Sequence, residues 1–202
     1  MLKEVCVGSF LEAKMAEKRG AGRIELCDRL DEGGTTASYG TIKKCVESLN
    51  IPVFALVRPR SGDFIYSCYE IDIMREDIKL CKGLGVKGIV IGILNNKNEI
   101  DYETLRDFVK LAHPLEVTFH KAIDEVKDPV KEIPKLKAAG VSRILSSGKG
   151  KTALEGKKLL NKMIEAAGAN MTVIVSGKIT KENFDEVSQE IKSSEYHGRK
   201  IL

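Results

Sequence analysis

Short apolar runs alternate regularly with longer amphipathic stretches along this chain, and this alternation constrains the fold more than any other feature. The apolar runs predict strands near residues 3–7, 23–27, 53–58, 88–94, 115–121, 143–147, 171–176 and 195–199. The amphipathic stretches predict helices near residues 10–19, 37–49, 69–83, 102–112, 129–139, 153–167 and 181–192. Strict alternation of strands and helices is typical of an α/β protein with a parallel sheet.

The spacing of the predicted strands distinguishes between two α/β architectures. Strand starts at Lys87, Leu115, Arg143 and Met171 are 28 residues apart, as expected for one βα unit repeated around a closed sheet. We therefore predict a TIM-like (β/α)8 barrel that forms one domain over residues 1–202, with eight parallel strands and seven outer helices. An open, doubly wound sheet is the alternative. No strand is followed by a GxGxxG or P-loop motif, so this alternative is less favoured and no nucleotide cofactor is expected.

Capping residues mark several predicted helix ends. Asp128 precedes Pro129, an arrangement that favours the start of a helix, and the segment Thr152–Glu155 matches a capping box. Gly20, Gly140 and Gly168 stand where helix ends commonly need a left-handed residue. These signals support the predicted helix boundaries.

Composition limits the classes of function. The chain has 33 basic and 29 acidic residues, a net charge of +4 that is spread over many segments, so we expect no nucleic-acid partner. Its five cysteines form no CxxC pair, which suits a reducing compartment. The sequence shows no signal peptide and no apolar run near the ~18 residues of a membrane span. We therefore expect a cytoplasmic protein with no membrane partner.

Strand 23–27 carries charge and a thiol on the face opposite its apolar residues. In a barrel, Ile24 and Leu26 would face the helices, while Glu25 and Cys27 would face the interior. The C-terminal ends of the strands form the active-site face of such barrels. Other polar residues expected near these strand ends are Glu4, Cys6, Arg58, Arg60, Thr118, His120, Ser147, Ser176 and His197.

Two interpretations of these polar residues are open. Glu25 and Arg58 could neutralise one another as a buried ion pair. Alternatively, arginine forks could hold a carboxylate or phosphate while an imidazole transfers a proton. In that case the candidate catalytic residues are Glu25, His120 and Asp124, and the candidate ligand-binding residues are Arg58, Arg60, Asp63, Ser147, Ser176 and His197. Asp63 and Asp124 would orient the other groups.

Several segments resemble the CutC family, which is named for a proposed role in copper homeostasis. The resemblance rests on EVCV at 4–7, RIELC at 23–27, EGGTT at 32–36, VRPRSGDFIYS at 57–67, VTFHKAID at 117–124 and ILSSG at 144–148. It implies a TIM-barrel-like fold and a Cu(I) site formed by Cys6 and Cys27. Ala37 replaces a common proline, and the chain stops at Leu202 where longer members continue to a final helix.

Two functions from different classes follow as hypotheses. The resemblance implies a copper-homeostasis protein that binds Cu(I). The polar residues predict an enzyme acting on a small phosphorylated or carboxylated metabolite. The chain lacks Cys-rich or His-rich tracts, and we assign Cys45, Cys68 and Cys81 to helix packing. If the outer ring lacks an eighth helix, exposed apolar surface would remain, and we expect a homodimer to cover it.

Overall fold

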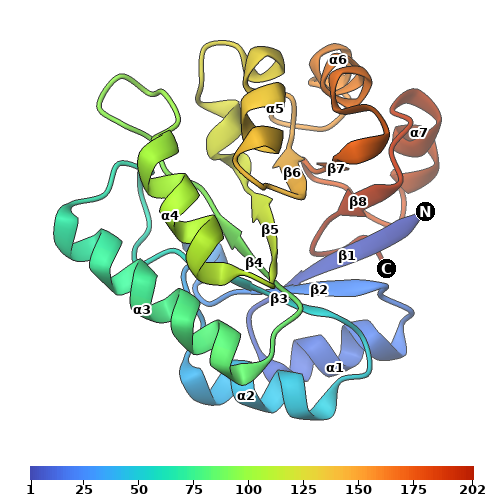
Figure 1. Ribbon diagram of the computed structural model, residues 1–202. Coiled ribbons are helices and arrows are strands. Elements are labelled where there is room, and N and C mark those ends of the chain that lie inside the picture. Colours follow the sequence, from blue (N-terminus) through green and yellow to red (C-terminus); the bar gives the residue numbers. More distant parts are fainter.

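Eight parallel strands form a closed barrel, and each strand pairs with its neighbours in sequence order (Figure 1). The computed structural model describes all residues from 1 to 202. The strands are β1 (Leu2–Val7), β2 (Arg23–Leu26), β3 (Val53–Leu56), β4 (Gly88–Ile91), β5 (Glu116–Phe119), β6 (Arg143–Ser146), β7 (Thr172–Val175) and β8 (Glu195–His197). Pairing of β8 with β1 closes the barrel, as predicted from the regular spacing of the strands.

Seven α-helices surround the strands, which confirms the predicted number (Figure 1). They are α1 (Phe10–Lys18), α2 (Tyr39–Ser48), α3 (Cys68–Leu84), α4 (Tyr102–Ala112), α5 (Pro129–Ala138), α6 (Lys157–Ala167) and α7 (Phe184–Glu190). Three short 3-10 helices, η1 (Leu30–Glu32), η2 (Lys121–Asp124) and η3 (Gly168–Asn170), lie in the connections. None of the helices combines the length and the apolar character needed to cross a membrane.

Most predicted elements lie in the right place, but several boundaries were wrong. The apolar runs at 53–58 and 88–94 leave the sheet early, because β3 ends at Leu56 and β4 at Ile91. Side chains beyond these points, including Arg58, therefore belong to loops at the barrel mouth. The Thr152–Glu155 pair forms its two reciprocal hydrogen bonds in a turn, and α6 begins only at Lys157.

Other predicted helix ends are confirmed. Asp128 accepts a hydrogen bond from the Lys131 amide at the start of α5. Gly20 and Gly140 have φ angles of 91° and 88°, in the region that favours glycine. These helix ends can be predicted from sequence because each depends only on residues within one helical turn.

The barrel separates two apolar regions. Ile24 and Leu26 are fully buried in the large outer core between sheet and helices. A smaller interior cluster contains Cys27, Phe54, Leu56 and Val90. The outward position of the strand β2 apolar side chains is therefore confirmed.

A charged layer fills the N-terminal end of the barrel interior. Arg23 binds Glu4 and also donates to Glu195 over 2.5 Å. Arg143 binds Glu116, and its Nε atom lies 3.2 Å from Glu195. Both guanidinium groups lie against the Phe54 ring, at 4.8 and 5.3 Å from its centroid. Buried charges need such partners, and this layer explains why β2 carries an inward arginine.

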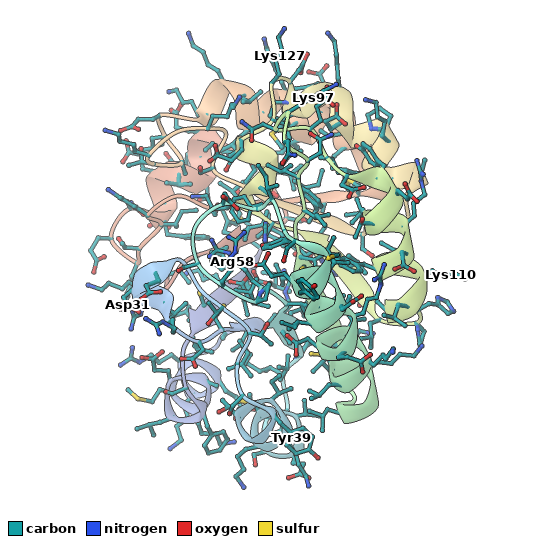
Figure 2. The ribbon with its side chains drawn as sticks, turned by 90° about the vertical axis from the view of Figure 1, so that its left-hand side faces the viewer. Asp31, Tyr39, Arg58, Lys97, Lys110 and Lys127 are labelled. Atoms are coloured by element: carbon teal, nitrogen blue, oxygen red, sulfur yellow. The ribbon has the colours of Figure 1, made fainter.

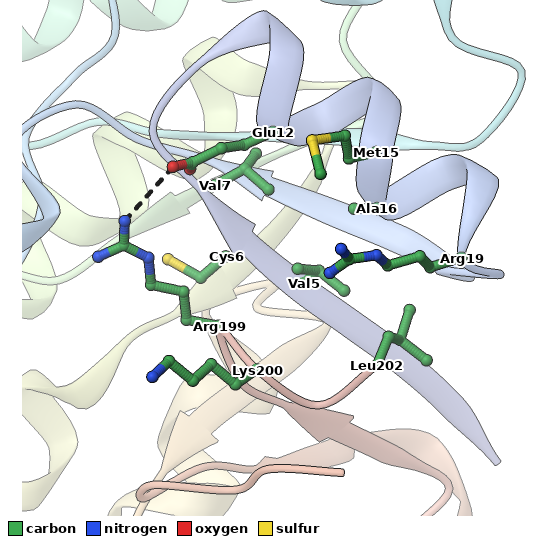
Figure 3. A pocket seen from close by; sticks show the side chains of 10 residues that line it. All are labelled: Val5, Cys6, Val7, Glu12, Met15, Ala16, Arg19, Arg199, Lys200 and Leu202. Atoms are coloured by element: carbon green, nitrogen blue, oxygen red, sulfur yellow. Dashed lines mark hydrogen bonds and ion pairs between the residues drawn. The ribbon is translucent and has the colours of Figure 1, made fainter.

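A surface groove lies between β1, α1 and the C-terminal residues (Figure 3). It encloses about 170 Å³ and is lined by apolar side chains that include Val5, Met15 and Leu202. Arg199 contacts Glu12 over 3.3 Å at its edge (Figure 3). This is the surface that we expect a homodimer to cover, and the homodimer stays a prediction.

Candidate functional site

Two adjoining cavities open at the C-terminal ends of the strands. One encloses about 200 Å³ and is lined by Cys6, Glu25, Cys27, His120 and His197, among others. The second encloses about 340 Å³ and extends over the loops after β5 and β6. Both are lined by Gly33, Arg58, Phe64 and Lys121, so the two cavities form one continuous mouth. This is the face where barrel active sites are found.

Two thiols meet at one side of this mouth. The Sγ atoms of Cys6 and Cys27 lie 3.9 Å apart. On the paired strands Cys6 stands opposite Glu25, and Cys27 follows two residues later on the same face. The two sulfur atoms and a Glu25 carboxylate oxygen all lie within 4.8 Å of one another. The predicted meeting of Cys6 and Cys27 is thus observed, and the carboxylate joins them.

His197 on β8 connects the thiol cluster to the charged layer at the N-terminal end of the barrel interior. Its Nδ1 atom lies 2.8 Å from Glu4, and its Nε2 atom lies 3.7 Å from Glu25. Burial opposes protonation, but contacts with Cys6 and the two carboxylates raise the pKa of His197 well above its usual value. Burial likewise opposes ionisation of Glu4, but His197 and Arg23 lower its pKa to about 2. The raised pKa favours the protonated form of His197, which lies between the two glutamates.

The two thiols have different proton affinities. A hydrogen bond with Cys27 lowers the pKa of Cys6 to about 5, with a further contribution from His197. The same hydrogen bond, together with burial, raises the pKa of Cys27 well above its usual value. Burial also raises the pKa of Glu25. These opposite shifts correspond to a hydrogen bond that the Cys27 thiol donates to a Cys6 thiolate.

Arg58 occupies the other side of the mouth, and Figure 2 shows it near the centre of the molecule. Its guanidinium group donates to the Gly34 carbonyl over 2.8 Å and to the Gly62 carbonyl over 2.6 Å. The sequence-based hypothesis of a Glu25–Arg58 ion pair is therefore wrong. Glu25 stands opposite Phe54 in the sheet, and Arg58 lies four residues further along, in the loop. Its Nε atom is buried without a partner.

His120 follows β5 and is also buried. Its ring lies so close over Gly92 that a Cβ atom there would come within 2.2 Å of the imidazole, so only glycine fits. The Ala122 amide donates to Nδ1 over 3.1 Å, which leaves the proton of the neutral ring on Nε2. Burial and the Arg58 charge lower the pKa of His120 to about 3. This geometry favours hydrogen-bond donation by Nε2, which has no partner, over proton abstraction.

Asp124 organises the loop after β6. Its carboxylate accepts hydrogen bonds from Ser146 Oγ, from Ser147 N and Oγ, and from Lys149 N, at 2.5 to 3.1 Å. Ser147 lines the larger cavity, whereas the buried Ser176 hydroxyl has no partner and lines neither cavity. These contacts favour a positioning role for Asp124.

Arg60 and Asp63 lie apart from the two cavities. They contact each other over 3.0 Å, and Arg60 also binds Glu70 at the start of α3. These contacts hold together the loop that carries Phe64.

The other cysteines lie away from the mouth. Cys45 and Cys81 are buried as expected, but Cys68 is exposed, so its assignment to packing was wrong. Cys68 is the first residue of α3, where the helix meets solvent.

Sequence reasoning missed two residues that line the mouth, Phe64 and Lys121, whereas the glycine-flanked loop SSGKGKT at 146–152 pointed to the lysines of that loop, which include Lys149. Phe64 contacts the His120 ring at 4.7 Å between centroids, and the Arg58 guanidinium lies 5.0 Å from its ring. Lys121 and Lys149 stand at the rim of the larger cavity. Phe64 and Lys121 lie in quoted segments, but nothing in their spacing distinguished them from surface residues.

The model of the CutC family matches residues 1–202. The chain belongs to the CutC family. Copper homeostasis protein cutC homologs from Mus musculus and Homo sapiens are each 43% identical over 196 residues, covering 97% of this chain and 72% of theirs. The CutC resemblance found in the sequence is thereby confirmed over the whole chain.

Solved structures agree with this assignment. The crystal structure of CutC from Streptococcus agalactiae has a TM-score of 0.94 at 34% identity and covers 100% of both chains. Deoxyribose phosphate aldolase from Aeropyrum pernix has a TM-score of 0.74 at 13% identity, over 98% of this chain and 86% of that one. The second likeness concerns the barrel fold alone.

Proposed function

We propose that this CutC family protein binds Cu(I) at the barrel mouth through Cys6 and Cys27. The observation that carries the proposal is the 3.9 Å separation of their sulfur atoms. Two metal–sulfur bonds of about 2.3 Å each can span up to about 4.6 Å, so both sulfurs can reach one ion without a large movement.

The chemistry of the donors supports copper in its reduced state. Thiolate ligands are soft and favour Cu(I), whereas carboxylate and water favour harder cations. Cys6 already has thiolate character, whereas the Glu25 carboxyl beside the sulfurs is a harder donor whose raised pKa makes it a weaker ligand. Cys27 is buried, so the ion would be largely shielded from water.

The same features predict moderate affinity. Metal binding requires the ligands to lose their protons, and the raised pKa of Cys27 opposes this loss. His197, which is positively charged and close to the sulfurs, further disfavours a second cation. We therefore expect Cu(I) to bind measurably and to transfer to a strong chelator, as suits a protein that exchanges copper.

A competition titration against a chromophoric Cu(I) chelator of moderate strength tests this proposal. It is performed anaerobically in a Cys68→Ser background, which removes the exposed thiol. We expect one equivalent of Cu(I) per chain, with affinity reduced more than ten-fold in Cys6→Ser and in Cys27→Ser. Cys45→Ser is the matched control, since Cys45 is buried on α2 away from the mouth. Equal affinity in all of these variants would refute the proposal, as would tighter binding of Zn²⁺ than of Cu(I) at the same thiols.

A further inference from the structure

The mouth contains buried polar atoms that the thiol cluster does not use. Arg58 Nε and His120 Nε2 are both buried and have no hydrogen-bond partner in the protein. Each side chain is only 5% exposed, and each lines the smaller cavity. A buried donor without a partner is costly, and a ligand that accepts from it removes that cost.

These two donors are held rigidly and close to one another. Both lie against the Phe64 ring, and Arg58 lowers the pKa of His120 through its charge. The carbonyls of Gly34 and Gly62 fix the guanidinium group, and the Ala122 amide fixes the imidazole. Two of the five guanidinium N–H groups of Arg58 donate to these carbonyls, and the Nε–H group has no acceptor in the protein.

The charge around the larger cavity is mostly positive. Arg58, Lys121 and Lys149 line it, and Glu125 and Asp124 are its acidic side chains. Asp124 is already occupied by hydrogen bonds from the loop after β6. The three cations outnumber the two acidic side chains around a volume of about 340 Å³. Lys149 Nζ already donates to the Val126 carbonyl over 2.6 Å, but its charge remains, so the cavity suits an anionic group attached to a small organic part.

We propose that the barrel mouth binds a small phosphate monoester, with its phosphate group held by Arg58 and His120 and with Lys121 and Lys149 at the rim. The arginine supplies a planar fork that matches phosphate oxygens. His120 donates from Nε2 to the same group or to the neighbouring ester oxygen. Cys6 and Cys27 line the same smaller cavity as Arg58 and His120, but none of the proposed contacts uses their sulfur atoms.

Isothermal titration calorimetry on the copper-free protein, with glycerol 3-phosphate and inorganic phosphate as probes and glycerol as the neutral control, tests this inference. We expect glycerol 3-phosphate to bind more tightly than inorganic phosphate, and glycerol not to bind. Arg58→Lys keeps the charge but loses the fork, and should weaken binding about ten-fold or more. No binding of either phosphate probe, or equal binding of both, would overturn the proposal.

Two further variants guard against a fold defect in Arg58→Lys. His120→Asn retains an oxygen that can accept from the Ala122 amide but removes the Nε2 donor. Lys121→Met alters an exposed residue at the rim. Both should weaken glycerol 3-phosphate binding. Lys151→Met is the matched control and should leave binding unchanged, since Lys151 is an exposed lysine of the loop after β6 that lines neither cavity. Equal weakening by Lys151→Met would contradict the assignment. Retention of binding in the Cys6→Ser, Cys27→Ser double variant would separate this site from the copper site.

Discussion

Arg23 on β2 donates a 2.5 Å hydrogen bond to Glu195 on β8, although 172 residues separate them in the chain. The same guanidinium binds Glu4 on β1, the strand that lies between the other two. One buried arginine therefore connects the three strands at which the barrel closes. Because Glu4 also contacts His197, this connection extends upward to the thiol cluster.

We predict that Arg23→Met lowers the free energy of unfolding by about 3–5 kcal/mol, because it removes the cation shared by Glu4 and Glu195 and leaves only His197 and Arg143 beside these buried carboxylates. Urea denaturation followed by circular dichroism measures this loss. Arg75→Met is the matched control, since Arg75 pairs with Asp72 and Asp107 on the exposed helix surface. It should cost less than about 1 kcal/mol. Similar losses in the two variants would contradict the assigned role of Arg23.

Gly92→Ala should destabilise the protein by about 1–3 kcal/mol, because the added methyl group overlaps the His120 ring. His120→Ala removes the ring and should relieve part of the overlap. A double-mutant cycle on the free energy of unfolding should therefore show that the second substitution costs less in the Gly92→Ala background than in the wild type. If the two changes in the free energy of unfolding are strictly additive, the added methyl group and the His120 ring do not clash.

Acid should destabilise the wild type partly through His120. The pKa of His120 is about 3 in the folded state, below the ordinary value of 6.5. Below pH 6.5, His120 therefore binds a proton in the unfolded state while it stays neutral in the folded state. The stability associated with the neutral ring is complete above pH 6.5 and falls as the pH decreases toward 3. In His120→Asn this contribution is absent. Between pH 7 and 5, the free energy of unfolding should decrease more steeply in the wild type than in the variant, and parallel curves would count against a buried neutral imidazole.

Asp124→Asn should loosen the loop after β6, because an amide nitrogen cannot accept the hydrogen bonds that reach one of the carboxylate oxygens. We expect faster hydrogen–deuterium exchange at the amides of Ser147 and Lys149, with a stability loss of about 1–3 kcal/mol. Exchange on α2, across the barrel, serves as the internal reference. Unchanged exchange at both amides would show that Asp124 does not hold this loop.

The sequence predicts features of this fold that depend on periodicity. Alternation along β2 places Ile24 and Leu26 outside and Glu25 and Cys27 inside, because successive side chains of a strand point to opposite faces. Regular spacing of the strand starts predicts the closed sheet, because it indicates one βα unit repeated around a barrel. The meeting of Cys6 and Cys27 follows once β1 and β2 are taken as neighbours, since a parallel register then places both on one face.

Other parts of the site depend on the paths of loops, which periodicity does not encode. The partners of Arg58 are the Gly34 and Gly62 carbonyls, and both come from connections after strands. For that reason the expected pairing with Glu25 was wrong. The donor role of His120 depends on one amide two residues away, a contact that requires the turn of η2. Strand ends were also predicted too late, because apolar residues such as Ile93 and Leu94 continue into the outer core after β4 has ended.

Copper K-edge X-ray absorption on the one-to-one Cu(I) complex, prepared anaerobically in the Cys68→Ser background, tests the proposed copper site most directly. The proximity of the Cys6 and Cys27 sulfur atoms predicts two sulfur neighbours per copper, at about 2.3 Å. Cys27→Ser should remove one of them. A first shell made only of nitrogen and oxygen atoms, or a sulfur shell that persists unchanged in Cys27→Ser, would contradict the assignment of Cu(I) to this pair of thiols.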